Sequence, residues 1–204
     1  MNPGSLSLRA TGPLAPLLGI AIGALGGIIY WLAAQIWPSS VAVILSMAAT
    51  ALLTTEFRAI GATRLDLLGR VLCLLIKYNA LMALSAAKLP FAVPANFPLA
   101  LLMICGYAAS FALLVFVMAG GAEKSAPKIG HAALLAALAI GFAPAALLGI
   151  PGLIGLAAAV IAGIGLLALL KYRRVGSAGE ALDLTQLTTE ACFYLGALAS
   201  WRFI

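Results

Sequence analysis

The chain has 204 residues, 64% of them hydrophobic and 9% charged, with a formal net charge of +6 and a mean hydropathy of +1.15. Soluble domains carry about a quarter charged residues, so this composition excludes an ordinary soluble enzyme, and we expect no nucleic-acid partner. A membrane-spanning helix needs about 20 apolar residues, which leaves room for roughly six to eight spans and little else. We therefore predict an all-α fold, a polytopic integral membrane bundle of about seven helices. Residues 1–204 would form a single membrane domain in contact with lipid.

Seven apolar segments follow one another, separated by proline, glycine and charged residues. In chain order they are Leu14–Ile36, Val41–Thr54, Val71–Ala87, Phe97–Met118, Ala132–Ile150, Gly152–Leu170 and Leu187–Trp201. Glycines recur at nearly helical spacing in the first and sixth segments, which predicts close packing of helix backbones. These glycines are Gly19, Gly23, Gly26 or Gly27, Gly155, Gly163 and Gly165. No internal repeat indicates a transporter built from paired halves.

The basic residues predict how the bundle is oriented. If the first end lies in the cytoplasm, nine basic residues fall on the inner side, Lys88 and Arg202 fall outside, and Lys77 lies within the third segment. Lys and Arg near span ends collect on the cytoplasmic side, so we expect a cytoplasmic N-terminus. The acids of the same inner loops are Glu56, Asp66, Glu123, Glu180 and Asp183. We therefore expect a multi-pass protein of the bacterial inner membrane with its polar loops in the cytoplasm.

Charged residues lie between the second and third segments and inside the third. Glu56–Arg70 mixes two acids and three Arg with Leu and Ile, which is typical of an interfacial amphipathic stretch; a role in gripping substrate is the alternative. Lys77 has three open interpretations within its span. It snorkels to the inner surface, pairs with an acid such as Glu190, or contacts a substrate phosphate.

The most informative segment is Gly179–Glu190. At 100° per residue, four polar residues share about a third of the circumference of a helix that starts near Gly179. These residues are Glu180, Asp183, Gln186 and Glu190. Grouped carboxylate oxygens suit Mg²⁺, so we predict the three acids as catalytic residues and Mg²⁺ ligands, with Gln186 contacting substrate. The alternative is a solvated helix start whose acids favour the helix dipole, which leaves Glu190 unexplained.

A short basic run precedes this predicted helix. Lys171, Arg173 and Arg174 would attract a phosphorylated substrate, although such a run is also the ordinary cytoplasmic end of a span. With Lys77 and Gln186, these three residues complete the set of candidate substrate-binding residues.

Three stretches resemble, in order, the integral-membrane cobalamin synthases, or adenosylcobinamide-GDP ribazoletransferases. Residues 16–54, which include Pro16-Leu17-Leu18-Gly19-Ile20 and Tyr30-Trp31-Leu32, look like the first two spans of that family. Leu74–Leu81 is similar to the third span. Gly179–Asp183 and Glu190–Gly196 look like the C-terminal motif, written G-D-x-L-G-A followed by Gln, Glu and an apolar run. Polar residues fall into register across these stretches: Gln35, Lys77, Gln186 and Glu190.

The resemblance implies a reaction, a cofactor and a substrate. It implies transfer of the cobinamide-phosphate group from adenosylcobinamide-GDP to α-ribazole or its phosphate, with release of GMP. It also implies Mg²⁺ as cofactor and a corrinoid nucleotide as substrate.

This chain departs from the family pattern at several places. The family carries an aspartate-rich motif, D-G-L-A-D-T-x-D-G, after the segment that here reads Leu52-Leu53-Thr54, whereas residues 55–62 of this chain contain no Asp. Tyr107 and Phe111 stand where the family tends to place His and Arg. Glu180 and Asp183 replace the Asp and Gly of the C-terminal motif. The alternative is therefore a non-catalytic relative, a structural or assembly subunit of a membrane complex, with a membrane protein partner or as a homo-oligomer.

Overall fold

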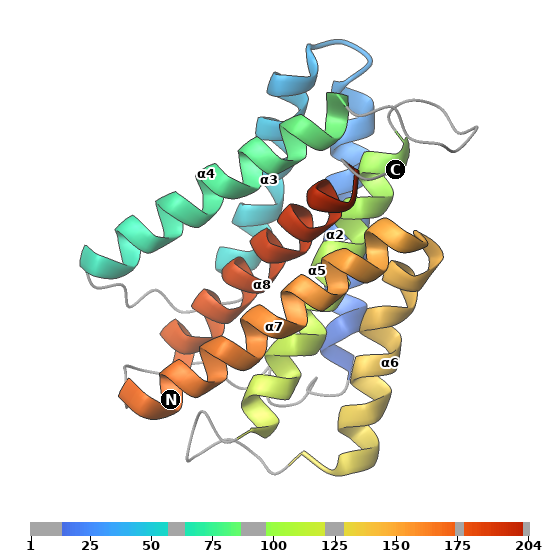
Figure 1. Cartoon of the computed structure of the whole chain (residues 1–204). Helices are drawn as coiled ribbons and strands as arrows, with labels where there is room; N and C mark the ends of the chain where they lie inside the picture. Colours follow the sequence, from blue (N-terminus) through green and yellow to red (C-terminus); the bar gives the residue numbers. More distant parts are fainter. Residues whose placement is uncertain (1–13, 57–63, 87–96, 121–128, 174–177, 202–204) are drawn as a thin grey trace.

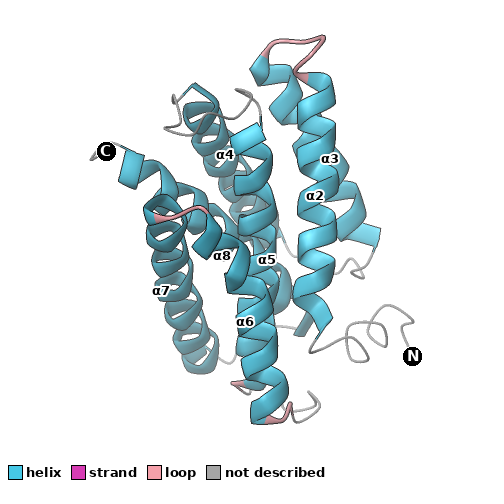
Figure 2. Ribbon diagram, turned by 90° about the vertical axis from the view of Figure 1, so that its right-hand side faces the viewer, coloured by secondary structure: helices cyan, strands magenta, loops and turns pink. Residues whose placement is uncertain are grey.

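The computed structural model describes residues 14–56, 64–86, 97–120, 129–173 and 178–201, and in these residues every regular element is a helix (Figures 1 and 2). In chain order the helices are α2 (Ala15–Ala33), α3 (Ser39–Glu56), α4 (Arg64–Ala86), α5 (Phe97–Ala119), α6 (His131–Leu147), α7 (Ile150–Arg173) and α8 (Ala178–Trp201). The prediction of an all-α fold is confirmed, with one helix for each of the seven apolar segments.

Four of the helices contain stretches long and apolar enough to cross a membrane. These stretches are Ala15–Ala33, Leu68–Ala86, Pro98–Ala119 and Ile150–Leu170, and Ser39–Thr54 and His131–Leu147 are shorter apolar helices. Consecutive helices alternate in direction through the bundle, so α4 and α8 run the same way (Figure 1).

Helix α5 forms the centre of the bundle. It packs against α2, α6, α7 and α8, and most of the side chains between Pro98 and Ala119 are buried. In contrast, only 22% of the residues in the apolar stretches of α4 and α7 are buried, as in helices that face lipid.

Glycines bring α2 and α5 together at the backbone. A Cβ atom built on Gly19 would lie 2.6 Å from the carbonyl oxygen of Tyr107, and one on Gly23 would lie 2.7 Å from the Cα of Ile104. No larger side chain fits there, which confirms the predicted packing role of these glycines. For Gly165 the prediction is wrong, because this position faces open space in the described structure.

Helix boundaries differ from the predicted ones at two informative places. Pro151 was expected to separate two spans, but it lies in the first turn of α7, where its missing N–H breaks no helical hydrogen bond. The turn is made instead by Gly149, whose φ of +68° favours glycine. Helix α4 begins at Arg64 and not at Val71, so part of the predicted interfacial stretch forms the first two turns of a long helix.

Candidate functional site

In the described part of helix α4, two charged residues face inward and several large apolar side chains face outward. Leu68, Leu72 and Leu75 are exposed along one face. Arg70 and Lys77 are seven residues apart, so at 100° per residue they share the opposite face, which is turned toward α8. This inversion of the usual amphipathic pattern is what lipid as a solvent requires.

Two ion pairs with the same spacing join α4 to α8. Lys77 Nζ lies 2.7 Å from Glu190 Oε1, and Arg70 Nη2 lies 2.7 Å from Asp183 Oδ2. Both partners advance by seven residues, which is two helical turns or about 10 Å along each axis. Because α4 and α8 run in the same direction, one register between the two helices aligns both pairs.

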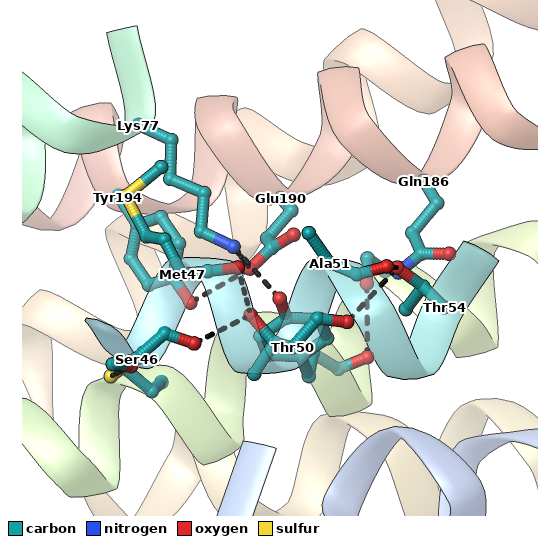
Figure 3. A network of polar contacts seen from close by, with 12 residues as sticks. Ser46, Met47, Thr50, Ala51, Thr54, Lys77, Gln186, Glu190 and Tyr194 are labelled. Atoms are coloured by element: carbon teal, nitrogen blue, oxygen red, sulfur yellow. Dashed lines mark hydrogen bonds and ion pairs between the residues drawn. The ribbon is translucent and has the colours of Figure 1, made fainter. Parts of the chain in front are cut away.

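The Lys77–Glu190 pair is enclosed by hydroxyl groups from three helices. Lys77 donates a hydrogen bond to the hydroxyl of Tyr107 at 2.9 Å, and its ammonium lies 4.5 Å from the centre of that ring. The hydroxyl of Tyr194 donates to Glu190 Oε1 at 3.1 Å. Thr50 of α3 is a further side-chain hydrogen-bond partner of Tyr107. Figure 3 shows Lys77, Glu190, Tyr194 and Thr50 converging on one point.

Burial makes this cluster depend on complete pairing. The side chains of Lys77 and Glu190 are 4% and 1% exposed, and no buried side-chain nitrogen or oxygen in the described residues lacks a partner. Removing two charges from water costs several kcal/mol per ion, and mutual attraction with extra hydrogen bonds offsets that cost. The cluster is therefore a satisfied polar core joining α3, α4, α5 and α8.

Helix α3 lines the cluster with small hydroxyl side chains. Thr50 donates to the carbonyl oxygens of Ser46 and Met47, and Thr54 donates to those of Thr50 and Ala51, all at 3.0 Å. Gln186 of α8 points toward Ala51 and Thr54 on this helix (Figure 3). The hydroxyls of Thr50 and Thr54 thus each find a backbone acceptor within α3.

Gly106 makes room for Tyr194. A Cβ atom at this position would lie 2.7 Å from both the Cζ atom and the hydroxyl oxygen of Tyr194. The absence of a side chain on α5 therefore allows the tyrosine ring to enter the bundle and reach Glu190.

The second pair lies nearer the start of both helices and is partly exposed. The side chains of Arg70 and Asp183 are 27% and 13% exposed. Arg70 lies in the first turn of the apolar stretch Leu68–Ala86, from where a long basic side chain would reach the boundary of a membrane that this stretch crosses. The two pairs thus join the same helices at two depths.

The structure brings together four of the residues singled out in the sequence. Lys77 and Glu190 form one contact, which confirms the pairing considered for Lys77, and Asp183 and Gln186 lie on the same face of α8 as Glu190. Arg174 and the side chains of Glu180, Lys171 and Arg173 lie outside the described residues. A substrate-binding role for Lys77, Gln186 and the basic run stays a prediction.

The predicted magnesium site also stays a prediction. Among the described residues, no group of three or more His, Cys, Asp and Glu side chains is placed to hold a metal ion. Asp183 and Glu190 are about 10 Å apart along α8, whereas Mg²⁺ holds its ligands at about 2.0–2.1 Å. While each keeps its basic partner, these two carboxylates do not fit a single ion.

Sequence reasoning missed several residues of the cluster. Tyr107 drew notice only as a departure from the family pattern, while Thr50 and Tyr194 were not singled out. Their signal was present, since a tyrosine hydroxyl inside an apolar span needs a hydrogen-bond partner, but the sequence does not say which helix supplies it.

The fold and this polar core define an all-helical, multi-pass membrane protein. No protein-family model and no solved structure matches the chain. An adenosylcobinamide-GDP ribazoletransferase of Leptothrix cholodnii is 32% identical to the chain over an alignment of 231 residues, gaps included. The alignment covers 92% of this chain and 84% of that protein. The chain therefore belongs to the adenosylcobinamide-GDP ribazoletransferase family.

The alignment also shows a difference in length. The aligned region of 231 residues is longer than the whole chain of 204 residues, so the relative contains segments that have no counterpart here.

Proposed function

We propose that this chain joins adenosylcobinamide-GDP and α-ribazole, or its phosphate, and releases GMP. In this reaction a hydroxyl oxygen of α-ribazole bonds to the phosphorus that carries cobinamide. The bond from this phosphorus to the oxygen shared with GMP breaks, the hydroxyl proton is released, and GMP leaves. The observation that carries the proposal is the 32% identity over 92% of the chain to a protein of that name.

The proposed setting is the bacterial inner membrane, with the N-terminus and polar loops in the cytoplasm. The distribution of basic residues supports this orientation. The starts of α4 and α8 would then lie at the cytoplasmic side, where a water-soluble nucleotide portion of the substrate arrives.

Mg²⁺ is proposed as the cofactor, with Glu180, Asp183 and Glu190 as the residues to test. Bound there, the ion would neutralise phosphate charge during transfer. Because Glu190 is held by Lys77 and Tyr194, we assign it first to the helix core. Glu180 and Asp183 are three residues apart, one helical turn, and are the better-spaced pair of donors.

A specific observation favours a second candidate, a non-catalytic relative that serves as a structural or assembly subunit. Residues 55–62 contain no Asp where the family pattern is aspartate-rich, and two predicted metal ligands, Asp183 and Glu190, are engaged by basic side chains. Under this alternative, the packed core is retained while metal-dependent chemistry is lost.

A GMP-release assay separates the two candidates. The protein is purified in mild detergent and supplied with Mg²⁺, adenosylcobinamide-GDP and α-ribazole. We expect GMP release that EDTA abolishes and that Glu180→Ala reduces strongly, while the control Glu123→Ala, which removes an acid of another predicted inner loop, retains it. Absence of GMP release at high protein concentration contradicts the proposal. Copurification of a partner in stoichiometric amount would then support the assembly role.

A further inference from the structure

The described part of the chain contains basic side chains that differ in their access to a phosphate group. A substrate with a GDP portion carries two negatively charged phosphates, so this inference rests on the proposed function for its choice of ligand. The Lys and Arg side chains that the structure describes are those of Arg70 and Lys77.

Lys77 is poorly suited to an incoming anion. Its ammonium contacts Glu190 and Tyr107 at 2.7 and 2.9 Å and lies over the Tyr107 ring, and the side chain is 4% exposed. A phosphate would have to enter the helix core and displace a buried carboxylate.

Arg70 has the opposite properties. It lies two turns closer to the start of α4, and its side chain is 27% exposed. Asp183 Oδ2 contacts one terminal nitrogen, Nη2, whereas a guanidinium carries five N–H donors on a planar fork that matches phosphate oxygens. The contact with Asp183 thus orients the guanidinium while leaving donors on its other edges.

The buried ion pair helps to hold Arg70 in one position. Lys77 and Glu190 fix the register of α4 on α8, and the same offset of seven residues places Arg70 beside Asp183. A guanidinium held from one side at a membrane boundary requires little reorganisation when it meets an anion.

We propose that Arg70 binds the diphosphate of a nucleotide substrate at the shared inner end of α4 and α8, and that Asp183 is a positioning residue for Arg70. The ligand class is a nucleoside diphosphate group, recognised through its phosphate oxygens and not through its base.

Direct binding of GDP and inorganic pyrophosphate to the purified protein tests this proposal. Isothermal titration calorimetry of the wild type should detect both probes, and Arg70→Gln should weaken both by about tenfold or more, because a charge-assisted hydrogen bond is lost. Arg70→Lys should retain part of the affinity. Lys124→Gln, which removes the same charge from another predicted inner loop, is the matched control and should bind as the wild type does.

Asp183→Asn separates substrate contact from a purely structural ion pair. If Arg70 contacts the phosphates and Asp183 only orients it, Asp183→Asn should weaken the binding of pyrophosphate clearly less than Arg70→Gln does. Equal loss of binding in Asp183→Asn and Arg70→Gln would overturn the proposal, as would unchanged binding in Arg70→Gln or no binding of either probe to the wild type at millimolar concentration. A single symmetrical peak in size-exclusion chromatography establishes that each variant is folded.

Failure of this inference is distinguishable from failure of the proposed function. GMP release whose KM for adenosylcobinamide-GDP is unchanged in Arg70→Gln supports the transferase and overturns the role of Arg70. Binding of pyrophosphate that depends on Arg70, without GMP release, supports the binding site and contradicts the transferase.

Discussion

The two ion pairs between α4 and α8 have the same spacing and the same contact distance, yet their surroundings differ. Lys77 and Glu190 are almost completely buried and are joined by two tyrosines, whereas Arg70 and Asp183 are 27% and 13% exposed. The protein encloses one pair and leaves the other partly exposed.

Burial, and not contact geometry, sets what each pair contributes to stability. A buried charge that loses its partner is left in a medium that cannot solvate it, so the buried pair acts as an obligatory lock between helices. A partly exposed pair is screened by water and contributes little to stability, which leaves its members available for binding.

Breaking the buried pair from one side should have the largest effect. Lys77→Met leaves the Glu190 carboxylate without its cation, and Glu190→Gln leaves the Lys77 ammonium without its anion. We expect each to lower the free energy of unfolding by about 3–5 kcal/mol. Chemical unfolding in mild detergent, followed by circular dichroism, measures the loss. A loss below about 1 kcal/mol would mean that the buried pair contributes no more to stability than an exposed ion pair, and would contradict this prediction.

Crowding the buried cluster should have an intermediate effect. Gly106→Ala forces a Cβ atom against the Tyr194 ring, which must move away from Glu190, and we expect a loss of about 1–3 kcal/mol. Gly165→Ala is the matched control, because nothing lies within 4 Å of its Cβ position, and it should be neutral or stabilising. Equal melting temperatures for the two variants would contradict the close approach of Tyr194 to α5.

Breaking the exposed pair should have the smallest effect on stability. Arg70→Gln and Asp183→Asn remove partners that water can replace, so we expect each to lower the free energy of unfolding by about 1 kcal/mol or less. The same unfolding measurement applies. A loss as large as that of Lys77→Met would mean that Arg70 is part of the helix lock and would weaken its assignment to substrate.

Much of the fold was predictable because lipid imposes simple rules. Apolar runs give the seven helices, and the stripe of Asp183, Gln186 and Glu190 follows from helical periodicity. Pairing of Lys77 with Glu190 was one of the expected outcomes, since an ionised group within a span must find an opposite charge.

The remaining parts depend on contacts between distant segments. Arg70 was placed in a surface stretch because a charge next to an apolar run resembles a span end, whereas here an acid on α8 allows the helix to continue through it. Gly23 and Gly165 each belong to a series of glycines at nearly helical spacing. Of these two, only Gly23 lies against a neighbouring helix. The packing of α3 and α5 decides which hydroxyl groups surround Lys77. The spacing of residues within one helix does not predict how two helices pack.

The central claim is that Lys77 and Glu190 form one buried unit between α4 and α8, and a double-mutant cycle on the free energy of unfolding tests it most directly. The cycle compares the wild type, Lys77→Met, Glu190→Gln and the double variant. The account predicts that the double variant is much more stable than the sum of the single losses implies, because no unpaired charge remains. Losses that add within about 0.5 kcal/mol would show that the two side chains do not interact and would contradict the account.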